Sequence, residues 1–325
     1  MTFLRLTITL LIFLNLSNAF ASSSSPAPLV ETEWLASQIS NVVVLDVRTS
    51  KKSFVSKPAF NKNKNTGKLS LSRVGGHIPD ARLVLYKNVR GDRLIDGKTV
   101  KHMVVSSEQF QTLMQQAGVD QDSHVVIATN AESGFDLTMA SRMYWQVKYF
   151  GHDKVSILNG GTAQWLIDGL DIETSLINHP PGNWKASSER KNLFASSDDV
   201  HTASNNDATQ LVDVRSLGQY LGTTKSGKAK AKGHIPTAKI FPIDLISNGS
   251  APVKFSASSE LKQLSKALSI NDQQDIITYC NSGHMASGGW FVFHEILGNK
   301  NVKLYDGSMH QWTLEDRPVI SMKIE

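Results

Sequence analysis

One stretch of the chain combines residue types that can carry out nucleophilic chemistry. Residues 275–287 read DIITYCNSGHMAS and contain Cys280, the only cysteine among 325 residues. The Ile-, Thr- and Tyr-rich run before Cys280 predicts a buried strand, and residues 290–297, closed by Gly298, predict a helix. The cysteine therefore stands at the end of a strand, in a polar loop that leads to a helix.

Such a loop brings several backbone N–H groups close to the cysteine sulfur. Together with the positive end of the following helix dipole, these groups favour bound anions and the thiolate form of a cysteine. A lone cysteine is otherwise often a small buried core residue. The polar residues after Cys280 argue against a core position, so the sequence predicts a nucleophilic thiolate in an anion-binding loop. We assign substrate contacts to the rest of that loop: Asn281, Ser282, Gly283, His284 and Met285.

Three of these loop residues have alternative roles. Gly283 allows a backbone turn that other residues avoid, so we expect it to shape the loop. Ser282 either donates a hydrogen bond to the substrate or caps the following helix. His284 either carries positive charge near neutral pH or orders the loop by packing.

The N-terminus has the pattern of a signal peptide. Arg5 precedes a short apolar run at residues 6–16, and the AFA triplet at residues 19–21 provides a small-x-small cleavage site. The apolar run is too short to span a bilayer comfortably. We therefore expect residues 1–21 to be removed and the mature protein to be exported, with no stable membrane anchor. The destination would be the periplasm in a Gram-negative source, and the protein would otherwise be secreted.

Composition restricts the remaining classes of protein. A mature chain of roughly 300 residues can form two domains with good cores. One cysteine cannot form an internal disulfide, and a free thiol in an oxidising compartment is a liability unless it has a task. The formal net charge of +5 is modest. It helps to attract small anions but does not indicate nucleic-acid binding.

Three sequence motifs occur twice, in the same order. LDVR at residues 45–48 recurs as VDVR at 212–215, and GHIP at 76–79 recurs at 233–236. VSILNGGTAQW at residues 155–165 recurs as VKLYDGSMHQW at 302–312. Such internal similarity indicates two homologous domains. We predict an N-terminal domain at residues 29–172, a turn-rich linker at 173–183 and a C-terminal catalytic domain at 184–325.

Within each half, short apolar strands alternate with helical patterns. Strands are predicted at residues 42–47, 125–128 and 155–158, and helices at 107–117 and 140–150. This alternation predicts an α/β fold in which each domain has a mostly parallel sheet with helices on both faces. Ligands bind such sheets beyond the C-terminal ends of the strands, which is where Cys280 lies.

The first half lacks a cysteine at the equivalent position. The strand at residues 125–128 corresponds to the one before Cys280, so the equivalent residue is Thr129. A threonine hydroxyl does not form a nucleophile comparable to a thiolate at neutral pH. We therefore expect the first domain to lack the chemistry and to serve as a scaffold or cleft wall.

The duplicated motifs, with the cysteine loop in the second copy only, resemble the two-domain rhodanese family of sulfurtransferases over essentially the whole mature chain. The resemblance implies tandem rhodanese-like domains and transfer of sulfane sulfur through a persulfide on Cys280. It implies a small anionic sulfur donor, thiosulfate or 3-mercaptopyruvate, and an acceptor that is cyanide, a thiol or an acceptor protein. This covalent chemistry needs no metal and no organic cofactor, and we expect neither.

The resemblance also implies that Arg215 binds the donor, because a planar guanidinium suits sulfonate or carboxylate oxygens. Arg48 occupies the same position in the half without a cysteine, so Arg215 alternatively forms a structural ion pair. By the same duplication, four further residues are interpreted as structural: Asp46, Asp213, His77 and His234.

The residues around the site favour one donor over the other. Family members that use mercaptopyruvate carry a second arginine where residues 217–220 read LGQY, and this chain has Gln219 there. They also have a loop serine, matched by Ser282, and a first-domain histidine, matched by His102, whose acidic partner is not evident. Members that use thiosulfate carry basic residues directly after the cysteine, where this chain has Asn281 and Ser282. Because the second arginine is missing, we predict thiosulfate, with 3-mercaptopyruvate as the alternative.

Two basic inserts precede the GHIP motifs, at residues 51–73 and 225–232. We expect each to be a solvated, flexible loop, and a positive rim that concentrates anions is the alternative.

Two other functional classes use a similar cysteine loop. A cysteine phosphatase or arsenate reductase would need an arginine six residues after the cysteine, where this chain has Ala286, so we exclude that class. A persulfide carrier that hands sulfur to a partner protein needs the same thiolate as the enzyme, so this alternative stays open.

Overall fold

The chain forms two parallel β-sheets, one in each half. A computed structural model describes residues 26–67 and 69–322. The first sheet has the order β1 (Leu29–Val30), β9 (Val155–Leu158), β8 (His124–Ala128), β2 (Val42–Arg48) and β5 (Arg82–Leu85). The second has the order β11 (Lys239–Ile240), β10 (Thr209–Asp213), β12 (Asp275–Tyr279) and β13 (Val302–Leu304). All pairs in both sheets are parallel, which confirms the predicted tandem α/β fold.

Helices cover both faces of each sheet. The first half contains α1 (Thr32–Gln38), α2 (Lys51–Val55), α3 (Ser107–Gln116), α4 (Gly134–Tyr149) and α5 (Gly161–Ile167). The second contains α6 (Ser197–Ala203), α7 (Leu217–Leu221), α8 (Ser258–Ala267), α9 (His284–Phe291) and α10 (Ser308–Leu314). Short 3-10 turns lie at η1 (Ile39–Asn41), η2 (Tyr86–Asn88), η3 (Lys191–Leu193) and η4 (Ile243–Leu245), and η5 (Val292–Ile296) is a π-helical turn after α9. Among the described residues, no helix is both long and apolar enough to span a bilayer.

Side chains alternate between the two faces of the first sheet, as the period of a strand requires. On β8, Val125 and Ile127 pack with residues of α3 and α4, whereas Val126 and Ala128 pack with residues of α1 and α5. Both faces are therefore apolar, which is why β8 reads as a continuous hydrophobic run.

Two helices begin earlier than the sequence pattern predicts. The start of α4 lies at Gly134, where Ser133 forms a capping box, and α9 begins at His284. The first turns of α9 are rich in small residues, which by themselves argue against a helix there. They are small because α4 and η4 approach closely: a Cβ on Gly288 would lie 2.9 Å from side-chain carbons of both Ile243 and Thr138.

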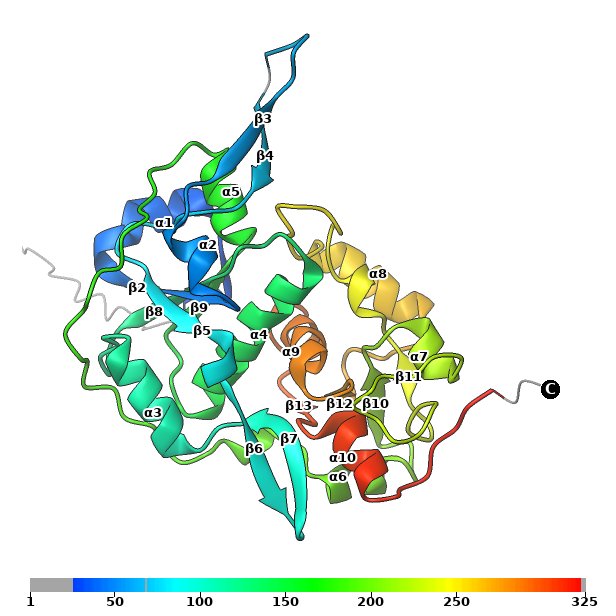
Figure 1. Cartoon of the computed structure of the whole chain (residues 1–325). Coiled ribbons are helices and arrows are strands. Elements are labelled where there is room, and N and C mark those ends of the chain that lie inside the picture. Colours follow the sequence, from blue (N-terminus) through cyan, green and yellow to red (C-terminus); the bar gives the residue numbers. More distant parts are fainter. Residues whose placement is uncertain (1–25, 68, 323–325) are drawn as a thin grey trace, which may run out of the picture.

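The halves differ most in two antiparallel hairpins of the first half, which project from opposite ends of the molecule (Figure 1). One joins β3 (Ala59–Lys62) to β4 (Leu69–Arg73), so the insert at residues 51–73, predicted as a flexible loop, is instead α2 followed by this hairpin. The other joins β6 (Arg90–Ile95) to β7 (Lys98–Val104) and reaches the second half, where Lys98 Nζ donates to the Leu314 carbonyl at 2.8 Å.

The two halves share one hydrophobic core. Figure 1 shows α4 and α9 side by side at the centre, and their buried residues belong to a single cluster that also contains residues of both sheets. The connection between the halves packs on the first: Trp184 is fully buried there, and the Arg190 N–H donates to the Tyr149 carbonyl at 2.9 Å. The predicted limits of the linker stay a prediction, and residues 1–21 lie outside the described part.

A buried ion pair joins the halves within this interface. Arg142 of α4 contacts Asp306, which follows β13, and both side chains are fully buried. Asp306 also accepts a hydrogen bond from the Val104 N–H of β7 at 2.6 Å, and Arg142 donates to the Gly283 carbonyl at 3.2 Å. The pair therefore ties α4, β7 and the cysteine loop together.

Removing one partner of this pair should destabilise the protein strongly. We expect Arg142→Leu to lower the free energy of unfolding by about 3–5 kcal/mol, because it leaves the Asp306 carboxylate buried without its cation. Lys254→Leu is the matched control, since Lys254 forms a partly exposed pair with Glu31 across the same two halves and should cost about 0–1 kcal/mol. Denaturant unfolding measures both, and equal losses would contradict the argument.

Candidate active site

Cys280 lies where the sequence predicts, directly after β12 and before the loop that leads into α9. The strand β12 is central in its sheet, between β10 and β13, so the loop sits at the C-terminal edge of a rigid frame. Cys280 is 2% exposed, and its Sγ accepts the Ser282 N–H at 3.5 Å. A backbone donor directed at the sulfur stabilises negative charge on it.

Ser308 organises this loop, and the sequence reasoning missed it. Its Oγ accepts the N–H groups of Cys280 and Gly283, both at 3.0 Å, and lies 3.9 Å from Cys280 Sγ. Ser308 has a φ of +52°, a left-handed conformation that non-glycine residues rarely adopt. The repeat contained the signal: the equivalent residue in the first half is Gly161, with a φ of +50°. A serine at this left-handed position, where the first half has a glycine, indicates that its hydroxyl has a structural role.

Gly283 is required by two independent constraints. Its φ of +73° is left-handed, and a Cβ there would lie 2.1 Å from Asp306 Oδ1 and 2.9 Å from Arg142 Nη1. The loop backbone is thus held against the ion pair that joins the halves, which extends the predicted role of Gly283 in loop shape.

Two cations from different halves meet at Ser282. Arg90 of β6 donates to the Ser282 carbonyl and lies 3.2 Å from its Oγ, and Lys228 Nζ donates to the same Oγ at 3.1 Å. Lys228 belongs to the second basic insert, yet it lies at the cysteine loop while keeping contact with solvent. Burial, and then the charge of Arg90, lowers the pKa of Lys228. These contacts favour the positive-rim interpretation of the insert at residues 225–232.

His284 is buried and serves as a link between the halves. The Tyr86 hydroxyl bonds its Nδ1, and Thr138 Oγ1 lies 2.8 Å from its Nε2. Burial raises the pKa of Tyr86 to about 12, so its hydroxyl can donate to Nδ1. The Thr138 hydroxyl contacts the carbonyl of Phe135 at 3.0 Å, which leaves its oxygen free to accept from Nε2.

The environment of His284 also excludes a charged ring. Burial and the nearby positive charges of Arg90 and Arg142 lower the pKa of His284 well below its ordinary value. The imidazole is therefore neutral at pH 7 and orders the loop by packing and hydrogen bonding, the second of its two predicted roles.

Arg215 has the same contacts as Arg48. In the first half, Arg48 binds Asp46 at 2.6 Å and the Gly76 carbonyl at 2.7 Å. In the second, Arg215 binds Asp213 at 2.6 Å and the Gly233 carbonyl at 2.8 Å, and it is 2% exposed. These contacts favour the structural ion pair, and a donor-binding role for Arg215 stays a prediction.

The remaining loop residues lie around the cysteine with different partners. Asn281 Nδ2 donates to Gln219 Oε1 at 2.8 Å, so the segment that lacks the family's second arginine does face the loop. Asn281 Oδ1 is buried without a partner among the described residues. Met285 is partly buried and packs against the shared core, which favours a structural role.

His102 lies at the edge of the same site, with an acidic neighbour that the sequence does not reveal. Its carbonyl accepts from Arg90 Nε at 2.9 Å, and its N–H donates to Asp92 Oδ1 at 3.2 Å. Asp92 is on β6 and His102 on β7, so the register of the hairpin brings them together. The Asp96-Gly97 pair between the strands is a sequence signal for a two-residue hairpin turn, so the hairpin could have been predicted, whereas the contact between Asp92 and the backbone of His102 is visible only in the fold.

Comparisons with known proteins agree with this geometry. The family model for the rhodanese-like domain matches residues 31–168 and 196–315. A Saccharopolyspora erythraea protein named "Putative thiosulfate sulfurtransferase" is 33% identical over 74% of this chain and 81% of its own length. The sulfur carrier protein TtuD of Thermus thermophilus is 31% identical over 73% of this chain and 82% of its own.

Solved structures show the same fold. The 3-mercaptopyruvate sulfotransferase SseA of Escherichia coli matches with a TM-score of 0.70 and 24% identity, over 87% of this chain and 99% of its own. The chain therefore belongs to the rhodanese-like domain family, with two such domains. It is a sulfurtransferase, and because Cys280 is its only cysteine, a persulfide intermediate can form at one place only.

Substituting Gly283 tests the constraints on the loop. We expect Gly283→Ala to cost about 1–2 kcal/mol for the left-handed backbone and about 1–3 kcal/mol more for overlap with Asp306. Gly298→Ala is the matched control, because Gly298 has a φ of +82° but nothing lies within 4 Å of the position that an added methyl group would take. Thermal unfolding and sulfur-transfer rates measure the difference, and equal destabilisation of the two variants would refute the close contact.

Proposed function

We propose that this protein transfers sulfane sulfur from thiosulfate to cyanide or a thiol through a persulfide on Cys280. The observation that carries the proposal is the meeting of Arg90 and Lys228 at Ser282, two residues from the cysteine. Two cations beside a sulfur nucleophile suit a small dianion that has to be held while it is attacked. The name of the Saccharopolyspora erythraea relative supports this choice of donor.

The reaction divides into two displacements at sulfur. In the first, the Cys280 thiolate attacks the outer sulfur of thiosulfate, a new S–S bond forms, and the original S–S bond breaks, so that sulfite leaves with the electron pair. In the second, the carbon of cyanide attacks the outer sulfur of the persulfide, and thiocyanate leaves while the thiolate is restored. No net oxidant or reductant is required.

The residues around Cys280 have separate tasks in this scheme. Lys228 and Arg90 bind the sulfonate oxygens of the donor and stabilise sulfite as it leaves. The Ser282 N–H, directed at Sγ, stabilises the thiolate and the persulfide. Ser308 and Gly283 fix the conformation of the loop so that the Ser282 N–H points toward Sγ.

One observation favours 3-mercaptopyruvate as a second candidate donor. His102 lies at the edge of the site: its backbone carbonyl accepts from Arg90, which also contacts Ser282, and its backbone N–H donates to Asp92. A carboxylate donor would use the same cations. A role as a persulfide carrier for a partner protein uses the same intermediate.

Steady-state kinetics test the proposal. The protein should form thiocyanate from thiosulfate and cyanide, and Cys280→Ser should abolish this because no other thiol is present. Lys228→Gln should lower kcat/KM for thiosulfate roughly 10–100-fold, as expected for loss of a charge-assisted hydrogen bond. Lys232→Gln is the matched control, because Lys232 is another exposed lysine of the same insert and is not among the described residues that contact the cysteine loop.

Four results would contradict the proposal or change the assignment. Retained activity in Cys280→Ser would exclude the persulfide on that residue. A Lys228→Gln variant no different from Lys232→Gln would exclude the cationic donor site. A kcat/KM higher for 3-mercaptopyruvate than for thiosulfate would move the assignment to the alternative donor, and sulfur transfer only to a specific protein would assign a carrier.

We also propose that the protein is exported after removal of residues 1–21. The charged, apolar and small-residue regions of the N-terminal sequence support this. Mass spectrometry of the protein isolated from its source should find a mature N-terminus at Ser22. A chain that keeps Met1 in the cytoplasm would contradict export.

A further inference from the structure

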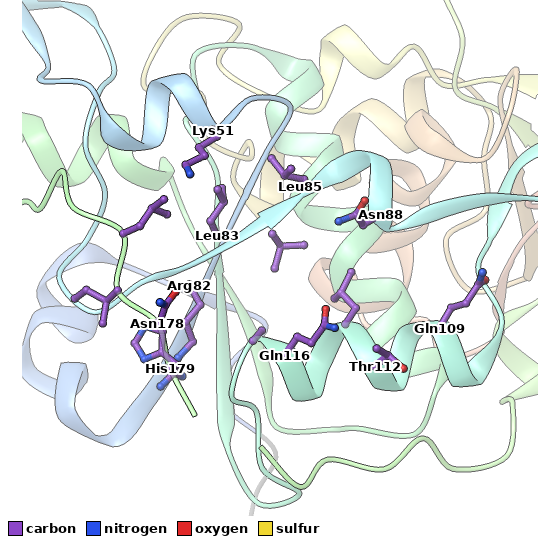
Figure 2. A pocket seen from close by; sticks show the side chains of 15 residues that line it. Lys51, Arg82, Leu83, Leu85, Asn88, Gln109, Thr112, Gln116, Asn178 and His179 are labelled. Carbon is purple, nitrogen blue, oxygen red and sulfur yellow. The ribbon is translucent and has the colours of Figure 1, made fainter. Parts of the chain in front are cut away.

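One cavity in the described part of the chain lies away from Cys280. It has a volume of about 580 Å³ and lies in the first half, between the edge strand β5, the helix α3 and residues 176–179 of the connection. Figure 2 shows Gln109, Thr112 and Gln116 in a row along α3, with Arg82 and His179 close together at the opposite end. Cavities of roughly 300–1,000 Å³ hold small organic ligands in other proteins. We call this space the linker cavity.

The cavity wall contains a guanidinium group without hydrogen-bond partners. Arg82 Nε and Nη1 are buried and have no partner among the described residues, and the side chain as a whole is 15% exposed. Arg82 forms a long ion pair with Asp80, whose Oδ2 lies 3.8 Å from Nη2, beyond hydrogen-bond distance. The more deeply buried Arg142 and Arg215 instead bond their carboxylate partners closely. The long pair leaves two buried N–H donors of Arg82 unmatched, which is costly, so Arg82 is poised to bind an external anion.

The imidazole of His179 lies in the same wall in a similar state. Its side chain is 11% exposed, its Nε2 is buried without a partner among the described residues, and its Nδ1 is 3.7 Å from Asp80 Oδ1. A ring with the proton on Nε2 can donate one hydrogen bond into the cavity. Arg82 and His179 therefore offer unused donors at one place, although they come from β5 and from the connection.

The charge around Arg82 selects the kind of anion. Asp80 and Asp120 both act on Arg82 electrostatically, so a group with two negative charges, such as phosphate, would be repelled more than one with a single charge. The rest of the wall includes apolar side chains: Leu83, Leu85 and Leu113, with Leu176 and Ile177, which are 45% and 44% exposed. A singly charged carboxylate with an apolar body matches both features.

We propose that the linker cavity binds an organic carboxylate, whose oxygens bond Arg82 and His179 and whose apolar part lies against the leucine side chains of β5 and α3. This site is separate from the donor site at Cys280, where Arg90 and Lys228 supply the cations. The carboxylate belongs to a free small molecule or to an acidic side chain of an extended peptide, and titration with matched probes distinguishes these sources.

Titration calorimetry on the full chain tests this site with four probes: hexanoate, hexanamide, and an acetylated Leu-Glu-Leu amide peptide with its Leu-Gln-Leu counterpart. Hexanoate should bind, and hexanamide should bind roughly tenfold more weakly or worse, because it lacks the charge that Arg82 requires. A peptide that binds more tightly than hexanoate, and only in its Glu form, identifies a peptide as the source. The reverse order identifies a free small molecule.

Variants locate the binding. Arg82→Gln should weaken hexanoate binding roughly tenfold without lowering the thermal unfolding temperature, because the charge it removes has only a long ion pair with the exposed Asp80. Arg73→Gln, an exposed arginine of β4, and Lys228→Gln, at the donor site, should leave binding unchanged. If Arg82→Gln fails to fold, His179→Asn replaces it, with the same expectation.

Several results would overturn the proposal. One is the absence of binding by hexanoate and by the Glu peptide, which would leave water as the only occupant. Another is equal binding of hexanoate and hexanamide. Binding that persists in Arg82→Gln, or that is lost in Lys228→Gln, would place the carboxylate elsewhere. An unfolding temperature that falls in Arg82→Gln with binding unchanged would make Arg82 a structural residue.

Discussion

The carboxylate of Asp306 is the point on which the rest of the site depends. It is fully buried and receives the guanidinium of Arg142 and the N–H of Val104, both from the first half, while the backbone of Gly283 lies against it. A buried charge needs all its partners, so the two halves cannot shift relative to each other without exposing an uncompensated ion. The cysteine loop is rigid for the same reason, because Gly283 packs directly against the Arg142–Asp306 ion pair.

Duplication explains how one half can lack the catalytic cysteine and still contribute side chains to the site. Both halves keep the same supporting contacts, an Asp–Arg pair that also binds the glycine of the GHIP turn, in Asp46 with Arg48 and in Asp213 with Arg215. Only the second half places a cysteine at the end of the central strand. The first half instead supplies groups to that cysteine loop from across the interface: Tyr86, Arg90, Thr138 and Arg142.

The sequence was sufficient for the features that repeat or follow a local period. The tandem α/β fold, the strand before Cys280 and the duplicated Asp–Arg pairs followed from motifs and alternation, but contacts made across the interface did not. Arg90 and Asp92 reach the site on the β6–β7 hairpin, whose Asp96-Gly97 turn is a sequence signal, but no local pattern shows which residues of the other half the hairpin contacts. Lys228 belongs to a segment that resembles any solvated basic loop. Ser308 could also have been identified from the sequence, because alignment of the two repeats places it opposite Gly161.

The distribution of charge follows from which groups can still reach water. Burial and the positive charges of Arg90 and Arg142 disfavour a charged ring at His284, so it stays neutral and acts through its two hydrogen bonds. Partial burial and the charge of Arg90 lower the pKa of Lys228, yet its side chain keeps contact with solvent and can follow an anion as it arrives and leaves. Arg90 and Lys228 thus have complementary roles. The side chain of Arg90 is held in place and orders the loop, whereas the flexible side chain of Lys228 accommodates the change from donor to product.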